Sequence, residues 1–112
     1  MNNKTKPTYP IPEAPAVKNG AFFLSGLGET TEIRIGSGGV WPPGAEYKFQ
    51  AVFLGTDKKW DSGYTSSANA LKADLPVNEM RPHIHREVEI KFYMKSEGVE
   101  HLSDPLTVRI LP

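Results

Sequence analysis

The chain has 112 residues, enough for one domain that buries a core without covalent cross-links. Lysine plus arginine and aspartate plus glutamate number 13 each and are interspersed, so no basic stripe directs the protein to nucleic acid. Because the sequence contains no cysteine, disulfides, thiolate-bound zinc and a cysteine nucleophile are excluded.

The sequence shows no targeting or membrane-spanning segment. Prolines follow the early lysines, where a secretory signal needs an apolar core of about 7–15 residues. No stretch approaches the roughly 18 apolar residues of a membrane helix. We therefore expect no membrane insertion and a protein that is cytoplasmic on synthesis, with export by a non-classical route left open.

Residues 1–18 are expected to form a proline-rich N-terminal extension, and residues 19–112 the domain itself. The prolines of the extension remove amide donors and favour extended polyproline II structure; they are Pro7, Pro10, Pro12 and Pro15. We interpret the extension as a spacer or as a leader packed along the domain edge. The alternative is a P-x-x-P ligand for a partner domain.

From about residue 20, apolar and polar residues alternate, which is typical of strands with one buried and one solvent-facing side. The segment "AEYKFQAVFL" shows the pattern most clearly. No window has the 3.6-residue period of a helix of useful length, so we predict an all-β protein. The runs expected to form strands are residues 21–24, 31–36, 45–54, 70–75, 87–95 and 105–111.

Glycine- and proline-rich clusters separate these runs at short intervals, as turns do. In "WPPGAE", Pro43 and Gly44 suit positions i+1 and i+2 of a type II turn. The segment "GTDKKWDSGY" predicts a polar hairpin leading into a short strand near Trp60 and Tyr64. About seven short strands at this spacing predict a sandwich of two antiparallel sheets, with a small barrel as the alternative.

The last third of the chain carries a recurring pattern. An alternating run "VEIKFYM" (88–94) leads through a glycine-containing loop to "SDPLTVRI" (103–110). This pattern resembles the final two strands of fibronectin type III and related immunoglobulin-like modules. The segment "VWPPGAEYKFQAVFLG" (40–55) is similar to the strand–turn–strand of immunoglobulin-like repeats in large bacterial surface and secreted proteins.

The resemblance covers about residues 20–111 and implies an immunoglobulin-like antiparallel β-sandwich of about seven short strands. The tryptophan expected on the second strand of fibronectin type III modules is missing from "TEIRIG" (31–36), and the cysteine pair of antibody domains is absent. These folds have no common functional site, so the resemblance carries over no functional residues.

His83 and His85 are one residue apart in "RPHIHREV". Residues i and i+2 of a strand share a face about 7 Å apart, so two imidazoles there could bind one metal ion. Glu87 and Glu89 would continue the same face. A run of two histidines, two glutamates and a lysine also fits the solvated side of a strand. We prefer that interpretation and expect no metal and no cofactor.

In the two-residue alternation of this segment, Arg86 falls on the same side as the apolar residues Ile84 and Val88. Either a bulge resets the register there, or Ile84 belongs to a turn and the strand begins later. We expect the second arrangement, since Pro82 also marks an edge or the start of a strand.

Four aromatic residues lie in predicted turns or on solvent-facing sides of predicted strands: Trp41, Trp60, Tyr64 and Tyr93. Exposed aromatics anchor interfaces because they bury a large area at a small entropic cost. We take these four as candidate binding residues for a protein or glycan partner. The alternative for Trp41 and Trp60 is that they cap the ends of the core.

No nucleophile elbow, triad context or phosphate-binding loop occurs in the sequence. We therefore expect a non-enzymatic binding, adhesion or structural module, present as a monomer or as a component of an assembly. A structural part of a phage or secretion apparatus is one alternative. A metal-dependent hydrolase using His83 and His85 is another.

Overall fold

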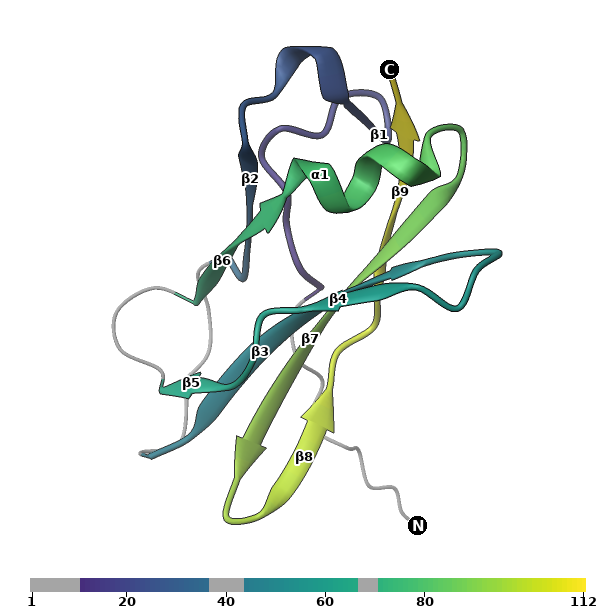
Figure 1. Ribbon diagram of the computed structural model, residues 1–112. Helices are drawn as coiled ribbons and strands as arrows, with labels where there is room; N and C mark the ends of the chain where they lie inside the picture. The colour runs from purple at the N-terminus through teal and green to yellow at the C-terminus, as the bar shows by residue number, and fades with distance from the viewer. Residues whose placement is uncertain (1–10, 37–43, 67–70) are drawn as a thin grey trace, which may run out of the picture.

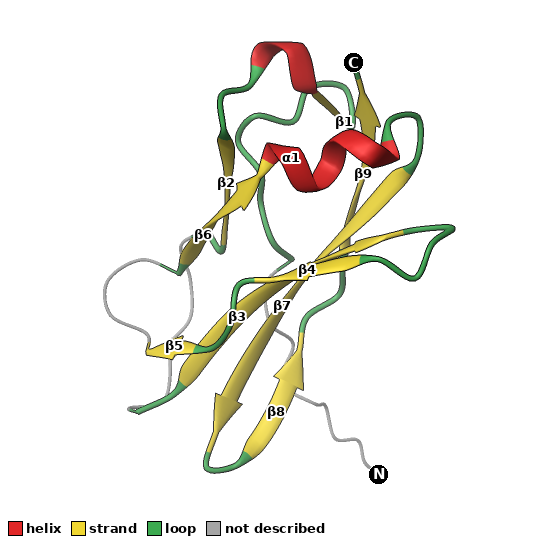
Figure 2. Ribbon diagram, in the orientation of Figure 1, coloured by secondary structure: helices red, strands yellow, loops and turns green. Residues whose placement is uncertain are grey.

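The computed structural model describes residues 11–36, 44–66 and 71–112 (Figure 1). These residues are mostly β-structure, with a few helical turns (Figure 2). The strands are β1 (Ala21–Phe23), β2 (Thr30–Arg34), β3 (Glu46–Phe53), β4 (Lys59–Asp61), β5 (Thr65–Ser66), β6 (Lys72–Pro76), β7 (Glu87–Ser96), β8 (Val99–Leu102) and β9 (Leu106–Leu111). The helical segments are the 3-10 turn η1 (Leu24–Gly26), the α-helix α1 (Val77–Met80) and the 3-10 turn η2 (Arg81–His83).

A large sheet of seven strands forms the main layer, in the order β1-β9-β7-β3-β4. Its centre is the antiparallel pair of β3 and β7, in which Phe49 lies opposite Phe92. β4 and β5 both pair with the other side of β3, and β8 and β9 both pair with the other side of β7. β1 pairs with β9 in parallel, so the sheet is mixed rather than purely antiparallel.

β2 and β6 form a second, small antiparallel sheet. Its buried apolar side chains, Ile33 and Leu75, belong to one hydrophobic cluster with the buried side chains of the large sheet and α1. The largest fully buried side chains of this core are Phe22, Phe49, Phe53, Phe92, Ile33, Leu75, Met80, Ile90, Met94, Ile110, Val77 and Val88. One hydrophobic core therefore joins the two sheets, and polar side chains such as Lys48 and Lys91 lie on the other face of the large sheet.

Alternation predicts the strands of the core well. Each of the six predicted runs overlaps an observed strand, and the predicted hairpin appears as the β3–β4 connection. Gly44 has a φ of 75°, which suits position i+2 of the predicted type II turn, although Pro43 lies outside the described residues. β8 and the helical segments are additions to the predicted set.

The connection from β6 to β7 is helical, which the sequence analysis missed. α1 follows Pro76 directly and continues into η2, as the red turns of Figure 2 show. Val77, Met80 and His83 are the buried residues of these two turns, one on every third position. This helical face covers one end of the core. No helix among the described residues is long and apolar enough to cross a membrane.

His83 and His85 do not share a strand face, so their predicted placement is wrong. His83 ends η2, is 8 % exposed, and stacks on Phe53 with ring centroids 4.3 Å apart and ring planes at 10°. Pro82 explains the difference, because its fixed φ and missing N–H suit the first turn of a helix. His85 lies exposed in the following turn with a φ of 75°.

β7 begins at Glu87, so Ile84 belongs to the turn and the strand starts later, as predicted. The turn is held by backbone hydrogen bonds to the last strand, in which His85 N donates to Ile110 O at 2.6 Å and Ile110 N donates to Arg86 O at 2.9 Å. These bonds fix the entry of β7 beside β9.

Residues 11–18, the described part of the proline-rich extension, pack against the domain. Glu13 and Arg34 exchange two backbone hydrogen bonds of 2.7 and 2.8 Å, which lengthens the β2 edge of the small sheet. Pro12 is buried, and Ala14, Ala16 and Val17 lie against the core. This part of the extension therefore follows the domain edge.

Candidate functional site

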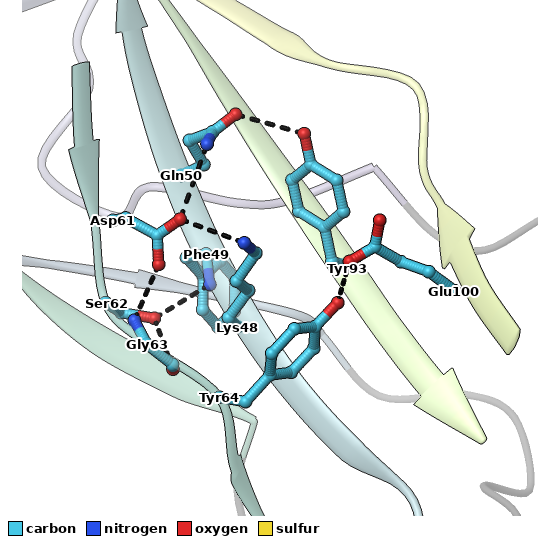
Figure 3. Close-up of polar contacts among 9 residues, drawn as sticks. All are labelled: Lys48, Phe49, Gln50, Asp61, Ser62, Gly63, Tyr64, Tyr93 and Glu100. Carbon is cyan, nitrogen blue, oxygen red and sulfur yellow. Dashed lines mark hydrogen bonds and ion pairs between the residues drawn. The ribbon is translucent and has the colours of Figure 1, made fainter. Parts of the chain in front are cut away.

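The four candidate aromatic residues separate into different environments. Tyr64 and Tyr93 come together on the outer face of the large sheet, the side away from the core (Figure 3). Trp60 pairs with Ala51 of β3 and packs, partly buried, against the core. Trp60 therefore lies on the core side of β4, away from the two tyrosines. Trp41 lies outside the described residues.

The two tyrosines belong to a group of polar side chains that we call the outer-face cluster (Figure 3). Its members come from strands β3, β4, β7 and β8 and from the link between β4 and β5; they are Lys48, Gln50, Asp61, Tyr64, Tyr93 and Glu100. β3 and β7 bring the cluster together, because their pairing sets Lys48 directly opposite Tyr93.

Lys48 is shared by the two tyrosines. Its Nζ lies 5.0 Å from the ring centroid of Tyr64 and 4.9 Å from that of Tyr93. Lys95 approaches the Tyr64 ring as well, with its Nζ 5.3 Å from the centroid. An ammonium within about 6 Å of an aromatic ring is attracted by the negative potential of the ring face. The lysines therefore hold both rings in place on the sheet.

Asp61 anchors Lys48 from the other side. Its carboxylate accepts hydrogen bonds from Lys48 Nζ at 2.9 Å and from the backbone N of Gly63 at 2.7 Å. Gln50 Nε2 also donates to it at 3.4 Å. Burial opposes the charged form of Asp61, but these hydrogen bonds outweigh it and hold the pKa of the carboxyl below its ordinary value.

The tyrosine hydroxyls are tied into the same network. Tyr64 donates a hydrogen bond to the carboxylate of Glu100, and Tyr93 donates one to Gln50 Oε1 at 3.0 Å. Burial raises the pKa of both phenols, and the charge of Glu100 raises them further. For Tyr93 the positive charge of Lys48 acts in the opposite direction. Both hydroxyls are therefore protonated donors at neutral pH.

A tight turn after β4 sets the position of Tyr64. Ser62 Oγ accepts a hydrogen bond of 2.9 Å from the backbone N of Phe49, which fastens the turn to β3. Gly63 has a φ of 79°, a conformation that a side chain disfavours, and its N–H is the one that Asp61 accepts. The segment "DSG" thus directs the chain so that Tyr64 returns over the outer face.

The outer-face cluster offers a mixed surface for contact. Two phenol rings lie beside ammonium and carboxylate groups, and Leu102, directly opposite Tyr93, adds an apolar side chain that is 52 % exposed. Each polar group of the cluster is held by a neighbour from another strand, so the surface is ordered before any partner arrives. Such an arrangement suits recognition by contact, with hydrogen bonds, charges and ring faces.

Sequence reasoning missed most of the cluster around the two tyrosines. The alternation correctly assigns Lys48 and Gln50 to the side of their strand that faces away from the core. It does not predict which strand lies beside this one. Glu100 was missed because β8 was not predicted. The serine and glycine of "DSG" gave a turn signal without indicating that the turn holds Tyr64.

The two histidines do not assemble a metal centre with neighbouring carboxylates. Among the described residues, no three histidine, aspartate or glutamate side chains lie close enough together to hold a metal ion. His83 is turned into the core and His85 lies exposed in the turn, so they do not converge as a strand pair would.

No protein-family model, curated protein or solved structure gives a significant match to this chain.

Proposed function

We propose that this chain is a non-enzymatic, immunoglobulin-like binding module that recognises a protein or glycan partner through the outer-face cluster. The strand order supports the fold assignment. In an immunoglobulin sandwich the strands G, F, C and C′ are neighbours in one sheet, and B and E are neighbours in the other. The neighbours β9, β7, β3 and β4, together with the pair of β2 and β6, have this order.

Two features depart from that plan. The first strand pairs in parallel with the last one, and the link from β6 to β7 is helical. Neither feature changes which strands are neighbours in the middle of the large sheet. The assignment therefore depends on the order of the central strands and on the single core between two sheets.

The observation that carries the binding proposal is the pair of tyrosines around Lys48. Tyr64 and Tyr93 are partly exposed on the face of the large sheet away from the core, and there they are held by lysine ammonium groups and a hydrogen-bond network. Ordered aromatics lose little entropy when a partner covers them, so they contribute strongly to affinity. Leu102 extends the same surface with exposed apolar area.

The main alternative is a structural role within a larger assembly, such as a phage or secretion apparatus. The same surface would then contact a neighbouring subunit, and purified protein would self-associate or bind other components. A metal-dependent hydrolase built on His83 and His85 has less support, because it required both imidazoles on one strand face.

The experiment compares three forms of the protein as immobilised bait in native extract of the source cells and on a glycan array. The test variant combines Tyr64→Ala with Leu102→Ser on the outer face of the large sheet. The control variant combines Lys72→Ala with Asp74→Ser, two exposed positions of β6 on the other sheet. Circular dichroism and thermal unfolding verify that all three forms are folded.

A partner that uses the outer-face cluster binds the original protein and the control variant equally, and binds the test variant at least about tenfold more weakly, as expected for loss of central aromatic contacts. A purified partner that binds all three forms with the same affinity would contradict the proposal. Size-exclusion chromatography with light scattering separates the assembly alternative, which expects oligomers that the test variant disrupts.

A further inference from the structure

A second candidate site lies at the end of the core that α1 and η2 cover. A hollow of about 280 Å³ opens there between the helical connection and the β3–β4 hairpin. This volume of about 280 Å³ lies just below the range of about 300–1,000 Å³ that is typical of pockets for drug-sized ligands, so the hollow suits only a smaller molecule or a single charged group. The residues that line it are Phe53, Lys58, Lys59, Asn78, Glu79, Pro82 and His83.

His83 is the unusual member of this lining. Its side chain is buried, at 8 % exposure, and one ring face is covered by the stacked ring of Phe53. Within the described part of the chain, neither of its ring nitrogens has a hydrogen-bond partner. Buried polar groups are nearly always hydrogen-bonded, and an unpaired one costs free energy. An imidazole at the wall of an open hollow can bond to water there, and a ligand oxygen that takes the place of this water can accept the same hydrogen bond.

The charged residues of the lining favour a negative ligand. Lys58 and Lys59 supply two ammonium groups, and Glu79 supplies one carboxylate, so the fixed charges leave an excess of one positive charge. Asn78 adds amide donors. Lys58, Lys59 and Glu79 are exposed, so these charges can move toward a ligand and can be replaced without disturbing the core.

We propose that this hollow binds a small ligand through an oxyanion, a phosphate or carboxylate group, held between the two lysines and the imidazole of His83. The ring of His83 donates a hydrogen bond to the oxyanion, and the stack with Phe53 keeps that ring at the wall. Glu79 lowers the affinity for simple anions and favours ligands that also carry a donor group. This site is separate from the outer-face cluster and does not depend on the function proposed for it.

The test uses inorganic phosphate and acetate as probes, each added to the full chain and followed by two-dimensional ¹H–¹⁵N NMR. We expect saturable shifts confined to the lining residues, with half-saturation at or below about 10 mM. The two probes distinguish a phosphate site from a carboxylate site. Sodium chloride at matched ionic strength controls for general screening.

Four variants test whether the charges and the imidazole of the lining determine the affinity for the preferred probe. Lys58→Gln with Lys59→Gln should weaken the preferred probe about tenfold, and Glu79→Gln should strengthen it severalfold. His83→Phe keeps the stacked ring but removes both nitrogens, so it should weaken the probe while the protein stays folded. Lys72→Gln removes an exposed lysine of β6 that does not line the hollow, and should leave the affinity for the probe unchanged.

Saturable binding that follows this order of variants would support the site. The proposal is overturned if neither probe gives saturable shifts at the lining residues, or if the double lysine variant and His83→Phe bind as well as the original protein. Equal weakening by Lys72→Gln would also overturn it, since that result reports only the overall charge of the protein.

Discussion

Two histidines separated by a single residue have opposite surroundings in this protein. His83 is buried and stacked on Phe53 at one end of the core, whereas His85 is exposed and has a φ of 75°. The difference arises from the local backbone, because η2 turns successive side chains by about a third of a turn where a strand would alternate them. A motif of two histidines therefore has no fixed meaning until the backbone between them is known.

Substitutions at His83 should separate two contributions to the free energy of unfolding, that of its packed ring and that of its polar ring nitrogens. His83→Ala leaves a cavity beside Phe53, and we expect it to lower the free energy of unfolding by about 2–3 kcal/mol. His83→Phe retains the stack and removes the unpaired nitrogens, so we expect a change within about 1 kcal/mol of zero or a slight gain. Urea unfolding followed by tryptophan fluorescence measures both.

His85→Asn is the matched control and should change the free energy of unfolding by no more than about 0.5 kcal/mol, because its side chain is exposed and asparagine tolerates positive φ. A loss for His85→Asn as large as that for His83→Ala would mean that the two histidines share an environment, as a solvated strand face would give them. That outcome would contradict the buried position of His83.

At the scale of single elements, the hairpin between β7 and β8 has a turn whose residue choice is not optimal. Ser96 pairs with Val99 across a two-residue loop, in which Glu97 has a φ of 53° and Gly98 a φ of 78°. Positive φ at both positions defines a type I′ turn, which favours asparagine followed by glycine. Glutamate at the first position therefore carries a conformational cost.

Glu97→Asn should relieve that cost and raise the free energy of unfolding by about 0.5–1 kcal/mol. Glu97 is exposed, so the substitution disturbs no core packing. The measurement is the urea midpoint at constant slope. Glu97→Val provides the opposite case, because a β-branched residue tolerates positive φ poorly, and it should lower the midpoint. A stabilising valine would show that the turn is not of this type.

The elements that the sequence predicts and those that it does not predict differ in which of their side chains are buried. The core strands alternate because one side is buried, and Val88 through Met94 follow that pattern without a break. β8 has its apolar residues Val99 and Leu102 exposed, at 54 % and 52 %, so hydrophobicity gives it no pattern to detect. α1 and η2 are too short to repeat a helical period.

A weak signal for the helical connection was nevertheless present. Val77, Met80 and His83 fall on every third position, and Pro82 stands where a helical turn tolerates proline. The outer-face cluster had no comparable signal. It depends on the register that sets Lys48 opposite Tyr93, and cross-strand register is a property of tertiary packing that a single sequence does not encode locally.

At the scale of the whole molecule, the formal charges cancel at pH 7. The response of stability to pH therefore depends on individual groups whose pKa differs between the folded and the unfolded protein. On the acid side the group to follow is Asp61, whose pKa is lower in the folded protein than its ordinary value of 3.8. The unfolded chain therefore binds the proton first. The stabilisation by Asp61 is present above pH 3.8 and is lost as the pH falls below that value.

Asp61→Asn should remove this contribution. We expect the variant to be less stable by about 0.5 kcal/mol at pH 7, a small value because the pair with Lys48 is partly exposed and screened. The two unfolding free energies should converge as the pH falls to about 2. A difference that persists at low pH would show that Asp61 acts through the shape of its turn rather than through its charge.

On the alkaline side the group to follow is Tyr64, whose pKa is raised in the folded protein above its ordinary value of 10.0 by burial and by Glu100. Above that pH the unfolded chain has released a proton that the folded protein still holds, so stability falls as the pH rises.

Tyr64→Phe keeps the ring over Lys48 but removes the hydroxyl. We expect this variant to be about 0.5–1.5 kcal/mol less stable at pH 7 and to approach the original protein as the pH increases beyond 10. Urea unfolding between pH 7 and about pH 11 measures the convergence. Tyr93→Phe removes the other raised phenol and serves as the comparison. If the original protein and Tyr64→Phe instead stay a constant interval apart through this range, the hydrogen bond from Tyr64 to Glu100 does not form in solution, and the outer-face cluster loses the contact that joins β8 to it.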